Sequence, residues 1–126
     1  MSGVDRDLND ANWKVRLACV RCMDWTPTSE QVETGLRDIS VPVRVAWVER
    51  TDWTPTHERV ERGLKDSDGY VRYAWAARTD WTPTYEQIER GLKDRLNRIR
   101  AAWMERLKVE QEKLMLDDRG LLESSL

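Results

Sequence analysis

The sequence predicts an all-α fold, a right-handed α-solenoid of about three and a half 28-residue helix-turn-helix repeats with a longer C-terminal capping helix. Three observations lead to this prediction. Residues 39–66 and 67–94 are identical at 18 of 28 aligned positions. A tryptophan recurs at the same spacing as Trp47, Trp75 and Trp103. The string Asp-Trp-Thr-Pro-Thr also recurs every 28 residues, at 24–28, 52–56 and 80–84.

Each repeat has the pattern of two short helices, as the unit 67–94 illustrates. Ser67 or Asp68 is a suitable N-cap for the first helix, because its side chain can accept a hydrogen bond from a free amide. After a corner at 79–81, the second helix begins either at Thr82-Pro83, with proline in the first turn, or at Thr84, which forms a capping box with Gln87. The expected buried faces are Val71, Ala74, Trp75 and Arg78 in the first helix and Tyr85, Ile88 and Leu92 in the second.

A glycine occupies the same register in every second helix, as Gly35, Gly63 and Gly91. This glycine either ends the helix in a left-handed conformation or leaves a gap for a close neighbour. The strict period of the tryptophans indicates that they form the core and corners of the stack rather than a platform for a ligand.

Helices of about ten residues are not stable in isolation, so neighbouring repeats must bury each other's apolar faces. We therefore expect a single repeat domain over residues 1–126. The cap helix is expected to run through about Met115 and to end near Asp117–Gly120, because no Thr-Asp-Trp corner follows Arg106. The expected parts are units at 11–38, 39–66 and 67–94, a C-terminal cap at 95–117 and a tail at 118–126.

An aspartate, a Val-Arg pair and an alanine in each first helix resemble the HEAT-like repeat family. These residues are Asp38, Val43, Arg44 and Ala46 in one unit and Asp66, Val71, Arg72 and Ala74 in the next. The Thr-Pro-x-x-(Glu/Gln) entry to the second helix is similar to the leucine-rich repeat variant, a related short α-solenoid. The resemblance covers roughly residues 10–106. It implies a protein-interaction scaffold in which the repeated Asp and Arg bond along the stack.

Composition narrows the classes of function. The chain has 23 acidic residues against 21 lysines and arginines, for a net charge of −2 at pH 7. This near balance disfavours a strongly basic nucleic-acid binder and a polybasic membrane anchor. No apolar run approaches the roughly 18 residues of a membrane span, and residues 1–10 lack the apolar core of a signal peptide. We expect a cytoplasmic protein that does not associate with membranes.

Few residues could carry chemistry. Cys19 and Cys22 form a Cys-x-x-Cys pair, and leucine-rich repeat variant proteins can hold an iron–sulfur cluster, but a cluster or structural zinc needs about four ligands. We expect both cysteines to be packing residues. His57, the only histidine, occupies a register that holds Ser29 and Tyr85 in other repeats. With no nucleophile beside a base and no phosphate-binding loop, we expect no enzyme, no cofactor and no metal site.

Two arginine series follow the repeat. The first series is Arg16, Arg44, Arg72 and Arg100, and the second is Arg50, Arg78 and Arg106. Arginines of the first series could contact phosphates, but each has an aspartate six residues earlier, which favours internal pairing; these aspartates are Asp10, Asp38, Asp66 and Asp94. Arginines of the second series follow the helical tryptophan by about one turn and could stack on indole rings.

Registers that vary between repeats are candidates for recognition. On the first helices, the apolar variable residues are expected to form an exposed stripe, which usually marks an interface. The alternative is that they pack laterally against the neighbouring first helix. The stripe comprises Leu17, Val20, Val45, Val48 and Tyr73, and the variable residues of the second helices are His57 and Tyr85.

These observations lead us to expect a non-catalytic protein-binding scaffold, whose partner is another protein or a second copy of the chain. One alternative is a phage- or mobile-element-borne inhibitor of a bacterial defence effector of the CRISPR type, a role that suits a small acidic chain without catalytic residues. Another is a nucleic-acid-binding domain similar to the HEAT-like DNA glycosylases for alkylated purines, against which the charge balance counts.

Overall fold

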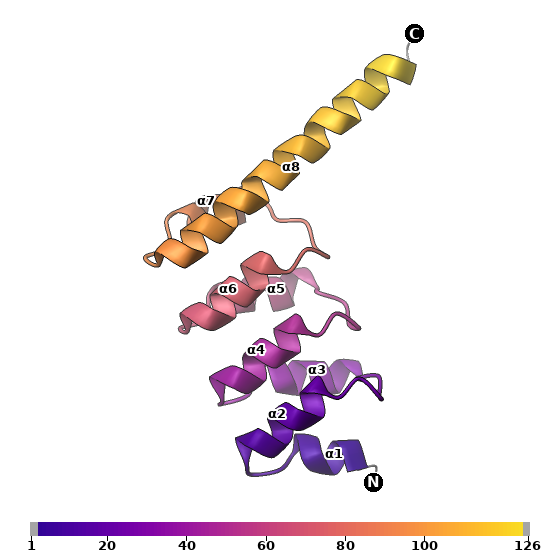
Figure 1. Ribbon diagram of the computed structural model, residues 1–126, viewed down its shortest axis with the longest axis vertical. Helices are drawn as coiled ribbons and strands as arrows, with labels where there is room; N and C mark the ends of the chain where they lie inside the picture. Colours follow the sequence, from indigo (N-terminus) through magenta and orange to yellow (C-terminus); the bar gives the residue numbers. More distant parts are fainter. Residues whose placement is uncertain (1–2, 125–126) are drawn as a thin grey trace. The chain divides into compact units, whose positions relative to one another are not determined.

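A computed structural model of the protein describes residues 3–124, with side chains described as far as Leu116. The described chain is all-helical and has no strand, so the predicted all-α class is confirmed for these residues (Figure 1). The helices are α1 (Gly3–Leu8), α2 (Trp13–Arg21), α3 (Ser29–Leu36), α4 (Val41–Glu49), α5 (His57–Leu64), α6 (Gly69–Ala77), α7 (Tyr85–Leu92) and α8 (Asn97–Ser124).

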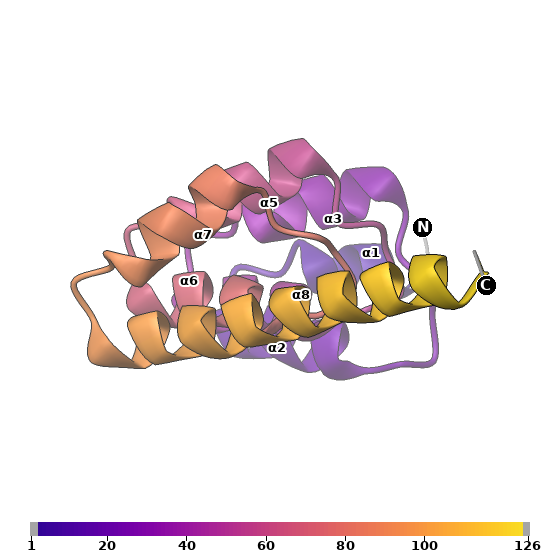
Figure 2. The same cartoon turned by 90° about the horizontal axis from the view of Figure 1, so that it is seen from above.

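The chain divides into two compact units, Met1–Trp81 and Thr82–Leu126. In the first unit, α2, α4 and α6 form one row, with α2 packed against α4 and α4 packed against α6. The helices α1, α3 and α5 are each packed against the helix that follows, and Figure 2 shows α3 and α5 on one side of that row. In the second unit, α7 packs against α8.

The helices begin at the caps that the sequence predicts. The Thr28 hydroxyl accepts a hydrogen bond from the Gln31 amide at 3.1 Å, and the Gln31 side chain accepts one from the Thr28 amide at 2.8 Å. Thr84 and Gln87 form the same capping box, so the second of the two predicted starting points is the correct one. Asp68 caps α6 by accepting a hydrogen bond from the Tyr70 amide at 2.8 Å.

Each repeated glycine provides room for a tryptophan. No glycine among the described residues has a positive φ, so the left-handed alternative is wrong and the close-neighbour alternative is right. A Cβ atom at these positions would overlap an indole ring, because it would lie far inside van der Waals contact. The distance from that Cβ to the ring would be 2.0 Å for Gly35 and Trp47, 1.9 Å for Gly63 and Trp75, and 2.3 Å for Gly91 and Trp103.

The corner tryptophans close each loop onto the helix before it. In each corner the indole Nε1 donates to a helix carbonyl: Trp25 to Cys19 (3.0 Å), Trp53 to Trp47 (3.0 Å) and Trp81 to Trp75 (3.1 Å). The ring pairs Trp25–Trp47 and Trp53–Trp75 meet edge to face, with centroids 6.0 and 5.7 Å apart. Because Trp47 and Trp75 are only 1% exposed, the helical tryptophans form the core, as predicted.

The helix α1 lies before the first predicted repeat and was not predicted from the sequence. It takes the register of a second helix, since Leu8 and Asp10 occupy the registers of Leu36 and Asp38. The Thr-Pro entry is missing, which is why the pattern was not visible. At the glycine register α1 carries Asp7.

The helix α8 continues to Ser124, beyond the end predicted near 117–120. No proline interrupts the segment, and a glycine in a helix costs only about 1 kcal/mol, so Gly120 does not end it. The helix also replaces the corner of earlier repeats. Arg106 pairs with Glu110 at 3.4 Å, four residues later, whereas Arg78 pairs with Asp80 in the corner, two residues later. The residues 125–126 of the predicted tail lie outside the described residues.

Candidate functional site

Two arginines of the first series, Arg16 and Arg44, form ion pairs with aspartates in the first unit. The Arg16 guanidinium donates to both carboxylate oxygens of Asp38 at 2.8 and 2.9 Å, and this hydrogen bond raises the pKa of Arg16. Arg44 binds Asp66 in the same way, at 3.1 and 3.2 Å. The predicted internal pairing of these two arginines with aspartates is therefore confirmed, with a different aspartate as the carboxylate partner.

The aspartate whose carboxylate binds each arginine is not the one expected. The aspartate six residues before each arginine contributes its main-chain carbonyl, not its carboxylate. Arg16 donates to the Asp10 carbonyl at 2.7 Å and Arg44 to the Asp38 carbonyl at 2.7 Å. The carboxylate belongs to the aspartate at the end of the arginine's own repeat, whereas the carbonyl belongs to the preceding repeat. These arginines are committed to structural bonds, which leaves them poorly placed to bind phosphates.

Arginines of the second series, Arg50 and Arg78, bind the corner of the preceding repeat. Arg78 is 6% exposed, pairs with Asp80 at 2.5 Å, and its guanidinium carbon lies 4.0 Å from the Trp53 ring centroid. Arg50 is equally buried and lies 4.1 Å from the Trp25 centroid. The predicted stacking on indole is confirmed for Arg50 and Arg78, although the closest ring is the corner tryptophan of the preceding repeat. Arg78 donates to the main-chain carbonyls of Val48, Arg50 and Trp53.

A third contact joins α3 to α5, the second helices of neighbouring repeats, through the carboxylate of Glu33. Glu33 on α3 accepts hydrogen bonds from Arg59 at 2.5 Å and from Arg62 at 2.9 Å, both on α5. One repeat earlier, Asp5 on α1 accepts a hydrogen bond from the Gln31 side chain at 2.7 Å. The hydrogen bond from Arg59 lowers the pKa of Glu33, and Arg62 adds to this shift.

The link at Glu33 is expected to make stability depend on acid pH. Because the folded-state pKa of Glu33 is lowered, its contribution is present above the ordinary glutamate pKa of about 4.3 and is lost as pH falls through the folded value. The Tm difference between the wild type and Glu33→Gln should therefore shrink between about pH 6 and about pH 3. Thermal melts followed by circular dichroism measure this difference. A difference that does not change with pH would contradict the assignment.

The residues considered for chemistry are not gathered in one place. Cys19 is buried, and burial raises the pKa of its thiol, with Asp7 adding to the shift. Cys22 is exposed and His57 is exposed at the start of α5. No group of three or more His, Cys, Asp or Glu side chains within the described part of the chain could hold a metal ion.

The structure divides the residues of the predicted apolar stripe into two groups. Val20 and Val48 are each 1% exposed, so the expectation that they lie in an exposed stripe is wrong, and they pack within the fold instead. Val20 lines the same cavity as Trp47 of the neighbouring helix α4. Tyr73 is 37% exposed, while Leu17 and Val45 are half-buried.

On the second helices, both variable residues are exposed. His57 begins α5 and Tyr85 begins α7, in different units of the chain. Tyr85 is 87% exposed, so its expected place in the buried stripe of that helix is wrong. The reason is that Tyr85 is the first residue after the cap, where its side chain extends away from the face that buries Ile88.

A groove of about 370 Å³ lies between α4 and α6 and brings two stripe residues together. Val45 and Tyr73 line it, with Val48 among its other lining residues. Tyr70 also lines the groove and is 63% exposed. Tyr70 was not among the predicted site residues, although its register varies between repeats as Lys14, Pro42, Tyr70 and Arg98. Glu49 and Asp80 add carboxylates to the lining, and Arg78, which pairs with Asp80, adds a guanidinium.

Comparisons with known proteins provide no family assignment: no protein-family model, curated protein or solved structure matches this chain. Among the described residues, none of the helices combines the length and apolar composition needed to span a membrane.

Proposed function

We propose that the chain is a non-catalytic repeat scaffold that binds a protein partner through the groove between α4 and α6. In this proposal the helices form a right-handed α-solenoid of about three and a half repeats, related to the HEAT-like and leucine-rich repeat variant families and closed by the capping helix α8. The protein acts in the cytoplasm. The row of α2, α4 and α6, and the bonds between repeats, support this architecture.

The exposure of Tyr70 and Tyr73 is the observation that carries the proposal. Tyrosine offers a large apolar surface and a polar hydroxyl at low entropic cost, and it is enriched in the energetically dominant positions of interfaces. The two tyrosines lie one turn apart on α6, and their exposed surface is available for a partner to pack against. The bonds of Arg16 and Arg44 to carboxylates support a protein partner over a nucleic acid.

The chemistry of the groove indicates the kind of segment it accommodates. Val45 and Tyr73 supply apolar contacts, and Glu49, which is exposed, supplies a negative charge. We therefore expect a partner segment with an apolar anchor residue and a basic residue next to it. This segment belongs to another protein or to a second copy of the chain.

Substituting Tyr73 with glutamate tests the proposal. Tyr73→Glu places a charge in the groove and should abolish partner capture from an extract of the source cells, while the circular dichroism spectrum and Tm stay unchanged. Ile39→Glu is the matched control, because Ile39 is 91% exposed and lies outside the groove. Light scattering of the wild type and Tyr73→Glu tests self-association.

Three results would overturn the proposal. Capture of the same partner by the wild type and by both variants would show that the groove is not the binding surface. Capture lost equally by Ile39→Glu would show that the effect is not specific to the groove. A large loss of Tm in Tyr73→Glu would place this face in the core.

A further inference from the structure

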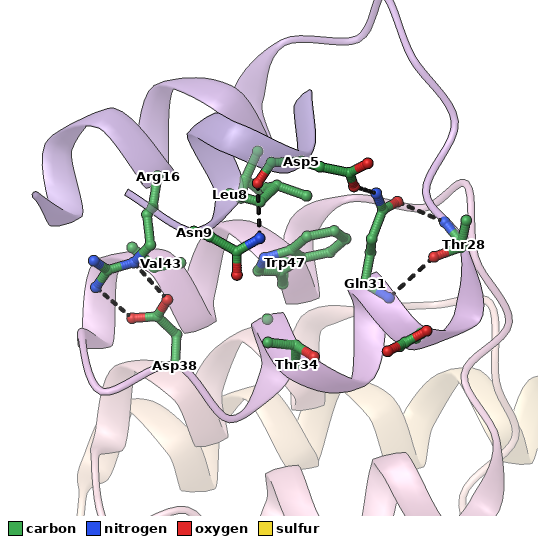
Figure 3. A pocket seen from close by; sticks show the side chains of 13 residues that line it. Asp5, Leu8, Asn9, Arg16, Thr28, Gln31, Thr34, Asp38, Val43 and Trp47 are labelled. Atoms are coloured by element: carbon green, nitrogen blue, oxygen red, sulfur yellow. Dashed lines mark hydrogen bonds and ion pairs between the residues drawn. The ribbon is translucent and has the colours of Figure 1, made fainter. Parts of the chain in front are cut away.

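Two cavities in the first unit are related by the repeat. One lies among α1, α2, α3 and α4 (Figure 3), and the other lies one repeat later. All nine residues that line the second cavity have their counterpart, 28 residues earlier, in the lining of the first. The two cavities therefore have the same frame and differ in the side chains that project into it.

The volumes of the two cavities differ greatly, at about 380 Å³ for the first and about 20 Å³ for the second. At two equivalent positions of the shared lining, the first cavity has smaller side chains than the second. Arg59 and Arg62 line the second cavity, and Gln31 and Thr34 take their registers in the lining of the first. The first cavity thus lacks the volume of two arginine side chains.

The charges of the two linings are opposite. The first cavity is lined by three carboxylates, those of Asp5, Glu30 and Asp38, and by one guanidinium, that of Arg16. The second is lined by three guanidinium groups and a single carboxylate. In the second repeat the acid at this register, Glu33, accepts hydrogen bonds from the guanidinium groups of Arg59 and Arg62, and at the same register of the first repeat Asp5 accepts a hydrogen bond from the Gln31 side-chain amide.

The apolar part of the first cavity suits an arginine stem. Leu8, Val20 and the buried Trp47 line it beside the polar groups, and Figure 3 shows the Trp47 ring among Asn9, Thr34 and Gln31. An arginine side chain packs its methylene groups on apolar surface, stacks its guanidinium on an indole and donates to carboxylates in a fixed plane. The cavity brings apolar side chains, an indole ring and carboxylates together in one lining.

We propose that this cavity binds the guanidinium of an arginine side chain from a partner protein, in the place that Arg59 and Arg62 occupy one repeat later. Asp5 is the principal acceptor. The inference rests on the proposed function only in taking the arginine from a protein. The site is separate from the α4–α6 groove, and its binding chemistry can be tested without a partner.

The probe is N-acetyl-arginine amide, titrated into the full chain while the indole N–H signal of Trp47 is followed by nuclear magnetic resonance. A group of this size is expected to bind with a Kd on the order of 1 mM. N-acetyl-citrulline amide has the same shape without the charge and should bind about tenfold more weakly or not at all. N-acetyl-lysine amide tests whether the planar guanidinium matters beyond its charge and should also bind more weakly.

Two variants connect the binding to the cavity. Gln31→Arg with Thr34→Arg installs the side chains of the second cavity and should abolish binding of the arginine probe while raising Tm. Asp5→Asn keeps the volume of the cavity and should weaken binding by about tenfold. Asp5→Asn also keeps the proposal testable if the double variant does not fold. Tyr73→Glu is the control and should bind the probe as the wild type does.

Saturable binding of the arginine probe that Asp5→Asn weakens would support the site even if the groove fails its own test. No binding of the arginine probe, equal binding of the citrulline or lysine probe, or unchanged binding by the folded double variant would overturn the proposal.

Discussion

Replacing Gly63 with alanine is expected to destabilise the protein by about 2 to 4 kcal/mol. Alanine improves helix propensity by about 1 kcal/mol, but the new Cβ would lie 1.9 Å from the Trp75 indole nitrogen. Trp75 is 1% exposed and cannot move without opening the core. The cost of displacing a buried tryptophan exceeds the gain in propensity, so the steric effect determines the sign. Urea denaturation followed by circular dichroism measures the change.

Gly3→Ala is the matched control for this substitution. A Cβ at Gly3 would meet only the end of the Arg6 side chain, at 3.8 Å, so little change in stability is expected. Asp7 and Cys19 allow the same packing rule to be tested in the opposite direction. They occupy the registers of Gly63 and Trp75, two repeats earlier. Cys19→Trp alone should destabilise the protein, and adding Asp7→Gly should recover part of the loss. Equal stability of Gly63→Ala and the wild type would refute the packing argument.

Replacing Arg78 with alanine is expected to destabilise the protein by about 3 to 5 kcal/mol. Arg78 donates to three main-chain carbonyls of the preceding repeat and stacks on Trp53 at 4.0 Å. Its removal leaves buried carbonyls without their donor, and a buried acceptor that loses its partner is costly. Arg78→Lys should recover only part of the loss, because an ammonium cannot reproduce the planar fork of donors.

Arg37→Ala provides the comparison for Arg78. The Arg37 side chain is 63% exposed and its ion pair with Glu33 spans 3.8 Å, so a change of less than about 1 kcal/mol is expected. Differential scanning calorimetry of the two variants beside the wild type gives both values. Similar small losses in the two variants would show that the corner does not depend on the buried guanidinium.

Three kinds of contact explain why the 28-residue period is strict. Arg16 reaches Asp38, Glu33 reaches Arg59, and Arg78 reaches the corner carbonyl of Trp53. The contacts of Glu33 and Arg78 join neighbouring repeats, and the contact of Arg16 joins the two ends of one repeat. An insertion within a repeat would change these separations, whereas a substitution affects a single contact. Differences between repeats at equivalent positions therefore have local effects. Gln31 and Thr34 stand at the registers of Arg59 and Arg62, and the cavity beside them is larger.

The sequence by itself determined the helical class, the period, the helix caps and the core tryptophans, because these depend on local hydrogen bonding and on residue spacing within one repeat. It also indicated the internal use of Arg16 and Arg44. Only the tertiary structure decided which variable positions are exposed, burying Val20 and Val48 while leaving Tyr73 accessible. That outcome depends on the offset between neighbouring helices, which no spacing within a single repeat encodes.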